Sequence, residues 1–274
     1  MKHRAFSILL SILLLTTLLG SCGPSPHTQH DAQKEEVLPT LTIGSSSYNP
    51  YFYVDEDGFY AGIDKEIAQE ACNRMNYKVV FKELSWGEQV RKLKNGSIDC
   101  IWGGFAMNGR EDEYQWAGPY LLSPIVACVR ADSNISTLND LQSKKVSVLV
   151  NSRAESYFLN QSGTSRLQVY TYNSLELAFA SFAKGYTDAV VGHQTGLNQY
   201  TQEDPSLYRY LNPPVHIAHL GVAFPKNADP DFVNQLSQTL DEMNEDGTIP
   251  AIAKKYGLTT SNLLEVTSDE DKKK

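Results

Sequence analysis

The residues that most clearly suggest chemistry lie in the stretch IDCIWGGFAMNGRED, residues 98–112. An apolar, strand-like run is followed there by Gly103 and Gly104, then by the aromatic Phe105, and then by Arg110 among acidic neighbours. A strand whose only role is to pack in the core has no need to end in two residues without side chains. Glycine pairs permit a backbone bend or the close approach of another group. The stretch therefore raises the question of a binding site.

Motifs of catalytic chemistry are incomplete in this chain. The segment SFAK, residues 181–184, has the S-x-x-K form of a penicillin-interacting serine, but neither K-T-G nor S-D-N accompanies it. Neither G-x-S-x-G nor H-E-x-x-H occurs. An acid–base pair of His193 and Glu111 stays open as an enzymatic alternative. The residues thus give an enzyme no complete signature.

The cysteines do not indicate a metal site. Past Cys22 only Cys72, Cys100 and Cys128 remain, each within an apolar stretch and none at metal-ligand spacing. We interpret them as thiols of the core, with one disulfide among them left open. We expect neither a metal nor a cofactor.

The N-terminus carries the features of an export signal. Lys2 and Arg4 precede an apolar run too short for a spanning helix, and Gly20 and Ser21 lead into Cys22. The ending LGSC resembles a bacterial lipobox, which implies cleavage before Cys22 and a lipid on its sulfur. We therefore expect a signal peptide over 1–21 and an extracytoplasmic protein anchored to the cell membrane. The alternative, an uncleaved anchor helix, leaves the location unchanged.

Composition restricts the partners and the ordered part of the chain. The formal net charge is −8, from 24 Lys and Arg against 32 Asp and Glu, which argues against nucleic acid as a partner. The polar, proline-bearing segment 22–40 is predicted to be a flexible tether, and the charged segment 260–274 a disordered tail. The residues between them suffice for one large or two modest domains.

Strand-like and helix-like segments alternate along this body, which predicts an α/β fold with largely parallel sheets. Apolar residues recur at helical spacing over 63–75, with Asp64 expected to cap that helix and Glu66 in its first turn. Extended crossings near 124–132 and 217–225 suggest two lobes joined by a pair of strands. Ligands of open α/β sheets lie beyond the carboxyl ends of strands.

Four motifs together resemble one known family. They are GIDKEIAQEAC at 62–72, WAGPY at 116–120, GYTDAVVG at 185–192 and DGTIPAIAKKYG at 246–257. In this order they are similar to the bacterial extracellular solute-binding proteins of family 3, the receptors of polar amino-acid ABC importers. Lys65 departs from the first motif, where an apolar residue is usual.

The resemblance implies a two-lobed periplasmic-binding-protein fold of type II. Lobe 1 would comprise 41–126 and 220–259, and lobe 2 would comprise 127–219. It further implies a monomeric receptor that captures a small carboxylate-bearing solute, an amino acid in the first instance, closes about a hinge and docks on an ABC permease. A solute sensor for a signalling partner and a dehydratase-like enzyme remain the alternatives.

The resemblance also assigns roles to residues. Tyr48, Trp86 and Phe105 fall on the family's aromatic positions, and Arg110 would bind a carboxylate in a forked geometry, although it stands one place before the family's arginine. The alternative for Arg110 is a surface ion pair with Glu111 or Asp112. For Tyr48 and Trp86 the alternative is a packing role alone.

Three further positions complete the expected site. Gly103 and Gly104 would let the solute lie against bare backbone, and Ser152 would receive an anion at the start of a helix. Arg153 stands beside Ser152 where the family has Thr.

His193 stands where the family has the acid that binds an α-ammonium. Because an unperturbed imidazole titrates near ~6.5, we expect affinity for an α-amino acid to fall between about pH 7.5 and 5.5. The alternative is that His193 turns away and caps the end of its strand.

Overall fold

The computed structural model describes residues 37–160 and 168–264. The predicted signal peptide, Cys22 and most of the predicted tether lie outside the described residues. The strands are β1 (Thr40–Ser45), β2 (Tyr53–Val54), β3 (Tyr60–Ala61), β4 (Lys78–Glu83), β5 (Cys100–Ile101), β6 (Gln115–Arg130), β7 (Lys145–Leu149), β8 (Gln168–Tyr172), β9 (Ala189–His193), β10 (Tyr208–Tyr210) and β11 (His216–Phe224).

Helices alternate with these strands, so the predicted α/β class is confirmed. The α-helices are α1 (Ile63–Arg74), α2 (Gln89–Lys94), α3 (Arg153–Leu159), α4 (Leu175–Ala183), α5 (Gln194–Thr201), α6 (Pro230–Glu245) and α7 (Thr248–Lys255). Short 3-10 turns are η1 (Trp86–Glu88), η2 (Leu138–Leu141) and η3 (Thr260–Asn262).

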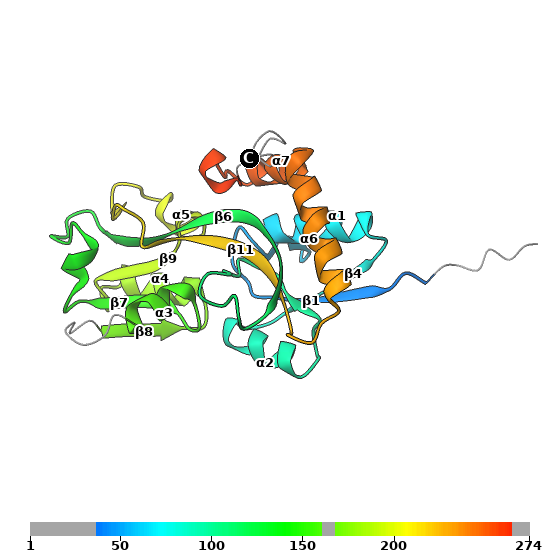
Figure 1. Cartoon of the computed structure of the whole chain (residues 1–274). Coiled ribbons are helices and arrows are strands. Elements are labelled where there is room, and N and C mark those ends of the chain that lie inside the picture. The colour runs from blue at the N-terminus through cyan, green and yellow to red at the C-terminus, as the bar shows by residue number, and fades with distance from the viewer. Residues whose placement is uncertain (1–36, 161–167, 265–274) are drawn as a thin grey trace, which may run out of the picture. The chain divides into compact units, whose positions relative to one another are not determined.

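One mixed sheet runs through the body in the order β4-β1-β5-β11-β6-β9-β7-β8, with β10 paired to β6 (Figure 1). At one end β4, β1 and β5 are parallel, and at the other β9, β7 and β8 are parallel. Between them β6 and β11 run antiparallel to each other over most of the length of β11. The parallel pairing predicted from the sequence is therefore confirmed at both ends, whereas the centre is antiparallel.

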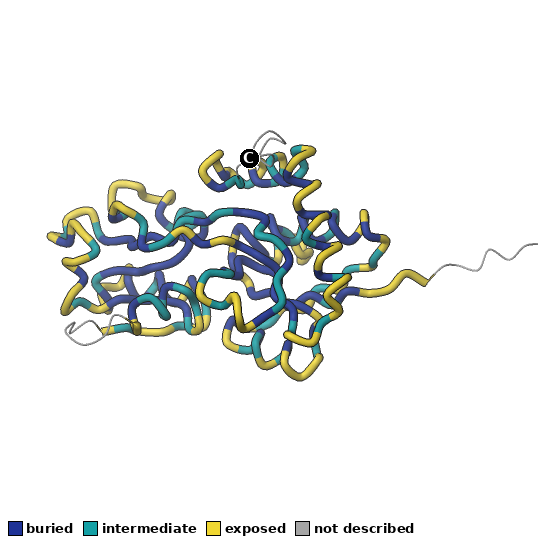
Figure 2. Tube along the Cα trace, in the orientation of Figure 1, coloured by how far each residue is buried: buried dark blue, intermediate teal, exposed yellow. Residues whose placement is uncertain are grey.

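Helices fall into two groups along this sheet. In the first group α1 packs on β4, α2 on β1 and β5, and α6 on β6, while α7 packs on α1 and α6 (Figure 1). In the second group α3 and α4 pack on β7 and β8, and α5 packs on β6 and β9. Each helix presents its apolar positions inward, as Leu236, Leu240 and Met243 do on α6. Figure 2 shows that the buried trace follows the central strands. Among the described residues β11 and β6 lie at the centre of the sheet, between the two groups.

The prediction that Asp64 caps the first helix is wrong. Gly62, with φ of 119°, occupies the N-cap of α1, and Asp64 lies inside the first turn with 1% of its surface exposed. Its carboxyl group points into the protein and accepts two hydrogen bonds there, from Gly104 and Tyr120. Glu66 in the same turn faces outward and binds Lys255 and Tyr256.

Two boundaries differ from the sequence prediction. The tail was expected to begin at residue 260, but Thr260–Asn262 forms η3, closed by a capping box from Thr259. Asn262 is buried, and its amide donates a hydrogen bond to the Leu122 carbonyl on β6. These contacts order the start of the segment. At the other end β1 begins at Thr40, one residue inside the predicted tether.

Cys72, Cys100 and Cys128 are free and buried, as predicted. Burial raises the pKa of the Cys72 and Cys128 thiols to about 12, so both stay protonated. In the part of the chain that the structure describes, no helix combines the length and apolar character needed to cross a membrane.

Candidate binding site

The glycine corner after β5 forms the floor of the site. Gly104 has a φ of 61°, a left-handed conformation that favours glycine, and its N–H donates to the Asp64 carboxylate at 2.6 Å. The second carboxylate oxygen accepts from the Tyr120 hydroxyl at 2.9 Å. Burial nevertheless raises the pKa of Asp64 to about 7. One buried carboxyl group therefore fixes the backbone of the corner.

Gly103 has a different role from the one predicted. A Cβ placed there would lie 2.9 Å from Ser45 Oγ on β1, whose hydroxyl donates to the Trp102 carbonyl. The missing side chain thus lets β5 and β1 approach each other. Gly103 lies behind the wall of the cavity, and Gly104 lines it.

An aromatic cluster closes one side. Tyr48 follows β1 and Trp86 begins η1, and their rings meet edge to face with centroids 5.7 Å apart. Phe105 lies behind Trp86, with 6.2 Å between ring centroids. Tyr48 is 3% and Trp86 5% exposed, so both are core residues as well as wall residues. Binding and packing are therefore not exclusive alternatives for this pair.

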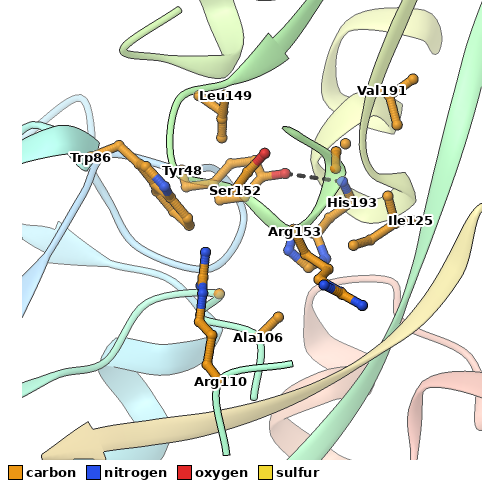
Figure 3. A pocket seen from close by; sticks show the side chains of 13 residues that line it. Tyr48, Trp86, Ala106, Arg110, Ile125, Leu149, Ser152, Arg153, Val191 and His193 are labelled. Atoms are coloured by element: carbon orange, nitrogen blue, oxygen red, sulfur yellow. Dashed lines mark hydrogen bonds between the residues drawn. The ribbon is translucent and has the colours of Figure 1, made fainter. Parts of the chain in front are cut away.

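Arg110 points into this cluster rather than away from it (Figure 3). Its guanidinium carbon lies 4.7 Å from the centroid of the Phe105 ring, and its Nη2 donates to the Asn151 carbonyl. Burial lowers the pKa of Arg110. Among the described residues it forms no ion pair with Glu111 or Asp112. The structure therefore does not contain the alternative in which Arg110 forms a surface ion pair with an acidic neighbour.

The opposite side of the cavity comes from the end of β7 and the start of α3. The Ser152 hydroxyl accepts the Glu155 N–H at 3.1 Å, so it serves as N-cap of α3 and retains its own proton for donation. Arg153 follows at the first position of the helix and also lines the cavity. Sequence reasoning noted Arg153 as a departure but did not place it in the site.

His193, the last residue of β9, is 7% exposed and lies between the rings of Tyr48 and Tyr51, with both centroids 5.6 Å away. The backbone N–H of His193 donates to the Tyr48 hydroxyl at 3.1 Å, the dashed line of Figure 3. Its Nδ1 is 2.8 Å from Ser123 Oγ, which is 2.7 Å from the Tyr51 hydroxyl. His193 thus lines the cavity and does not turn away from it.

The titration expected for His193 is wrong. Burial lowers the pKa of the imidazole to about 4, because a charge there would lose its hydration. The ring is therefore neutral at neutral and mildly acidic pH.

These elements enclose one cavity. Its lining combines both groups of elements: Tyr48, Trp86, Gly104, Ala106, Arg110, Ile125, Leu149, Ser152, Arg153, Ala154, Val191, Gly192 and His193. Of the predicted residues, all line it except Gly103 and Phe105. The apolar members were missed because a single apolar side chain carries no signal of function in the sequence. Within the described residues no group of three or more His, Cys, Asp or Glu side chains could hold a metal ion.

The cavity has a volume of about 20 Å³. This is room for roughly one water molecule. An amino-acid-sized solute therefore requires the two sides of the wall to separate.

Comparison with protein-family models gives one decisive match. The model described as bacterial extracellular solute-binding proteins, family 3, matches residues 41–259. The chain belongs to this family. The motif order in the sequence predicted it, and the match covers nearly the whole described body.

Relatives of this solute-binding protein carry names of binding function. The probable amino-acid-binding protein YxeM of Bacillus subtilis is 23% identical over 259 residues, covering 93% of this chain and 96% of its own. The L-cystine-binding protein TcyA of the same organism is 27% identical over 277 residues, covering 90% and 96%.

Solved structures share the fold. The crystal structure of Tv2483 bound to L-arginine has a TM-score of 0.75 and 26% identity, covering 84% of this chain and 94% of its own. An ancestral arginine-binding protein bound to arginine has a TM-score of 0.72 and 24% identity, covering 80% and 98%. The type II periplasmic-binding-protein fold predicted from the sequence is thereby confirmed.

Proposed function

We propose that this solute-binding protein is an extracytoplasmic receptor for a small carboxylate-bearing solute of the amino-acid type. The observation that carries the proposal is the position of Arg110, whose partly buried guanidinium lies against Phe105 and lines the cavity beside Trp86 and Tyr48. A guanidinium in an aromatic wall is suited to hold a carboxylate by two parallel hydrogen bonds. The names of the relatives support the same class.

A thermal-shift screen of amino acids, small peptides and polyamines tests the proposal. A solute at 100 times its dissociation constant adds about 2.7 kcal/mol to the free energy of unfolding. We expect carboxylate-bearing solutes to raise the melting temperature. If only compounds without a carboxylate raise it, the proposal is wrong.

Arg110→Gln removes the guanidinium and should weaken the binding of the best solute by about tenfold or more, since hydrogen bonds to charged groups contribute on the order of 1.5–3 kcal/mol. Arg91→Gln is the matched control, because Arg91 is exposed on α2 and pairs with Glu88. Calorimetry should give wild-type affinity for that control. Equal losses in both variants would contradict the role of Arg110.

Capture by closure about a hinge is part of the proposal. Its support is the size of the cavity, which must open to admit a solute, and the two strands β6 and β11 that join the flanking groups. The lobes are then 41–126 with 220–259, and 127–219.

Anchoring and delivery complete the proposed function. Cys22 would carry the lipid, and the closed monomer would dock on the membrane subunit of an ABC permease. Cys22→Ser should release the protein from the membrane fraction and abolish labelling by radioactive palmitate. Deletion of the gene should abolish uptake of the solute found in the screen, whereas a sensor would leave uptake unchanged.

A further inference from the structure

The cavity wall has an unusual balance of charge for a receptor of zwitterions. Two of its residues, Arg110 and Arg153, are cations, and none of the described residues that line it carries a carboxylate. His193, at the family's acidic position, contributes a neutral ring. Within 37–160 and 168–264 neither guanidinium forms a salt bridge.

Arg110 already has partners for part of its guanidinium. Nη2 donates to the Asn151 carbonyl, and the ring of Phe105 lies beneath the charge. The carboxylates that act on it electrostatically, Glu113 and Glu155, do so without a salt bridge. Its remaining donors are enough for one carboxylate of a solute.

Arg153 is less satisfied than Arg110. Its Nε is buried and has no hydrogen-bond partner in the described part of the chain. Its guanidinium is packed against Gly109, where an added Cβ would lie 2.8 Å from Nη1. Burial lowers the pKa of His216 on β11, and the charges of Arg153 and His219 lower it further. Buried donors in proteins are almost always paired, so this one is free to bind an acceptor from outside the chain, either a water molecule or a solute.

The carboxylate of this chain that Arg153 influences most clearly is exposed. The charge of Arg153 contributes to the lowered pKa of Glu111, whose largest cause is hydrogen bonding to backbone. Glu111 is a surface residue and does not line the cavity. Arg153 is therefore not neutralised from the cavity side.

We propose that the cavity selects a solute with two carboxylates, one for Arg110 and one for Arg153, and that an α-ammonium is dispensable for binding. The inference rests on the proposed function and narrows its solute class. Two guanidiniums without a wall carboxylate favour a dianion and disfavour a solute with a net positive charge. An ammonium group would meet Arg153 and the neutral His193 where the family has an acid.

Four solutes test separately whether the second carboxylate and the α-ammonium matter for binding. They are L-glutamate, glutarate, L-glutamine and L-arginine. Glutarate lacks the ammonium of glutamate, and glutamine lacks its second charge. By calorimetry we expect glutarate and glutamate to agree within roughly threefold, and each to bind about tenfold or more tighter than glutamine and arginine. If glutamine or arginine binds as tightly as glutamate, the dicarboxylate inference is wrong while the proposed function stands.

Arg153→Gln supplies the second test. The variant should lose about tenfold or more in affinity for glutarate and change little for glutamine. Lys226→Gln is the matched control, since Lys226 follows β11 and does not line the cavity. Circular dichroism establishes that both variants fold. An unchanged affinity of folded Arg153→Gln for glutarate would overturn the role of Arg153.

The outcomes also distinguish a failure of this inference from a failure of the proposed function. Binding of glutamate with loss of glutarate would show that the ammonium is required, and would overturn the inference alone. If no carboxylate solute of the wider screen binds, the proposed function and the inference fail together.

Discussion

The carboxyl group of Asp64 on α1 holds the N–H of Gly104 at 2.6 Å, across 40 residues of sequence. Gly104 lines the cavity, and its carbonyl is hydrogen-bonded to the imidazole of His193, an interaction that raises the pKa of that ring against the larger effect of burial. A single residue, Gly104, thus stands between Asp64 and His193, with its N–H bonded to one side chain and its carbonyl to the other.

Asp64→Asn should change how stability depends on pH. The pKa of Asp64 is about 7 in the folded protein, above its ordinary value. Between about pH 4 and 7 the folded state keeps a proton that the unfolded state has lost, so this group lowers the free energy of unfolding as pH rises. The amide should remove that slope, a difference on the order of 4 kcal/mol for a shift from 3.8 to about 7. Urea unfolding at several pH values measures it.

Asp57→Asn serves as the control for this experiment, because Asp57 is exposed in the loop before β3. It should leave the wild-type slope in place. If Asp64→Asn shows the wild-type slope as well, Asp64 does not hold its proton in the folded state.

His193 should contribute in the opposite sense. Its pKa is lowered to about 4 in the folded protein, so its contribution to stability is present above the unfolded value of roughly 6.5 and is lost as pH falls from there towards 4. His193→Gln should retain more of its stability than wild type over that interval. Parallel pH profiles of the two proteins would contradict the lowered pKa.

Solute affinity should not depend on His193 titration between about pH 7.5 and 5.5, because the buried ring stays neutral there. Calorimetry measures the affinity for glutarate at both pH values in wild type and in His193→Gln. The ratio of the two affinities should be the same in both proteins within roughly threefold. A fall in affinity that wild type shows and His193→Gln lacks would restore the titration expected from the sequence.

His193→Asp should restore the acid at the position that the family uses for an ammonium. A carboxylate in the wall would attract the ammonium of L-glutamine and repel glutarate, so the preference between these solutes should shift towards glutamine by about tenfold. His193→Asn is the uncharged control of matched size. If the Asp and Asn variants show the same preference between L-glutamine and glutarate, residue 193 does not contact the solute.

Gly104→Ala should weaken binding as well as folding. A side chain at positive φ costs about 1–2 kcal/mol, and the new Cβ would lie 3.3 Å from Tyr48 Cδ1 in the cavity wall. Gly96→Ala is the control: its φ is 71°, and no atom lies within 4 Å of its Cβ position. Both variants should lose similar stability, and Gly104→Ala alone should lose solute affinity. A loss of affinity in both would point to a general effect of destabilisation.

The sequence by itself determined most of the elements, the family and about half of the residues that line the cavity. Helices such as 63–74 and 230–245 follow from apolar residues at a spacing of three and four, because one face of each helix must be buried. Tyr48, Trp86, Gly104, Arg110, Ser152 and His193 were found through motifs that keep their order along the chain, and the structure brings them to one cavity.

Local sequence could not predict α5. The segment Gln194–Thr201 has few apolar residues and a glycine, so no helical period is visible. Its Gly196 lies so close to Tyr48 that an added Cβ would be 2.6 Å from the ring. The helix packs on β6, β9 and α4 as well as on this ring, which is 148 residues away in sequence, so tertiary contacts stabilise it where local propensity does not.

Tertiary structure also decided the charges of the site. Asp64 has the local sequence of a helix cap, but it became a buried acid because β5 ends against α1. Arg153 resembles a surface residue of a short helix, but it lines the cavity because β7 delivers that helix opposite Arg110. The pKa of His193 fell for the same kind of reason, since the rings of Tyr48 and Tyr51 exclude water from it. Burial depends on residues far apart in sequence, so none of these three states could be inferred from neighbouring residues.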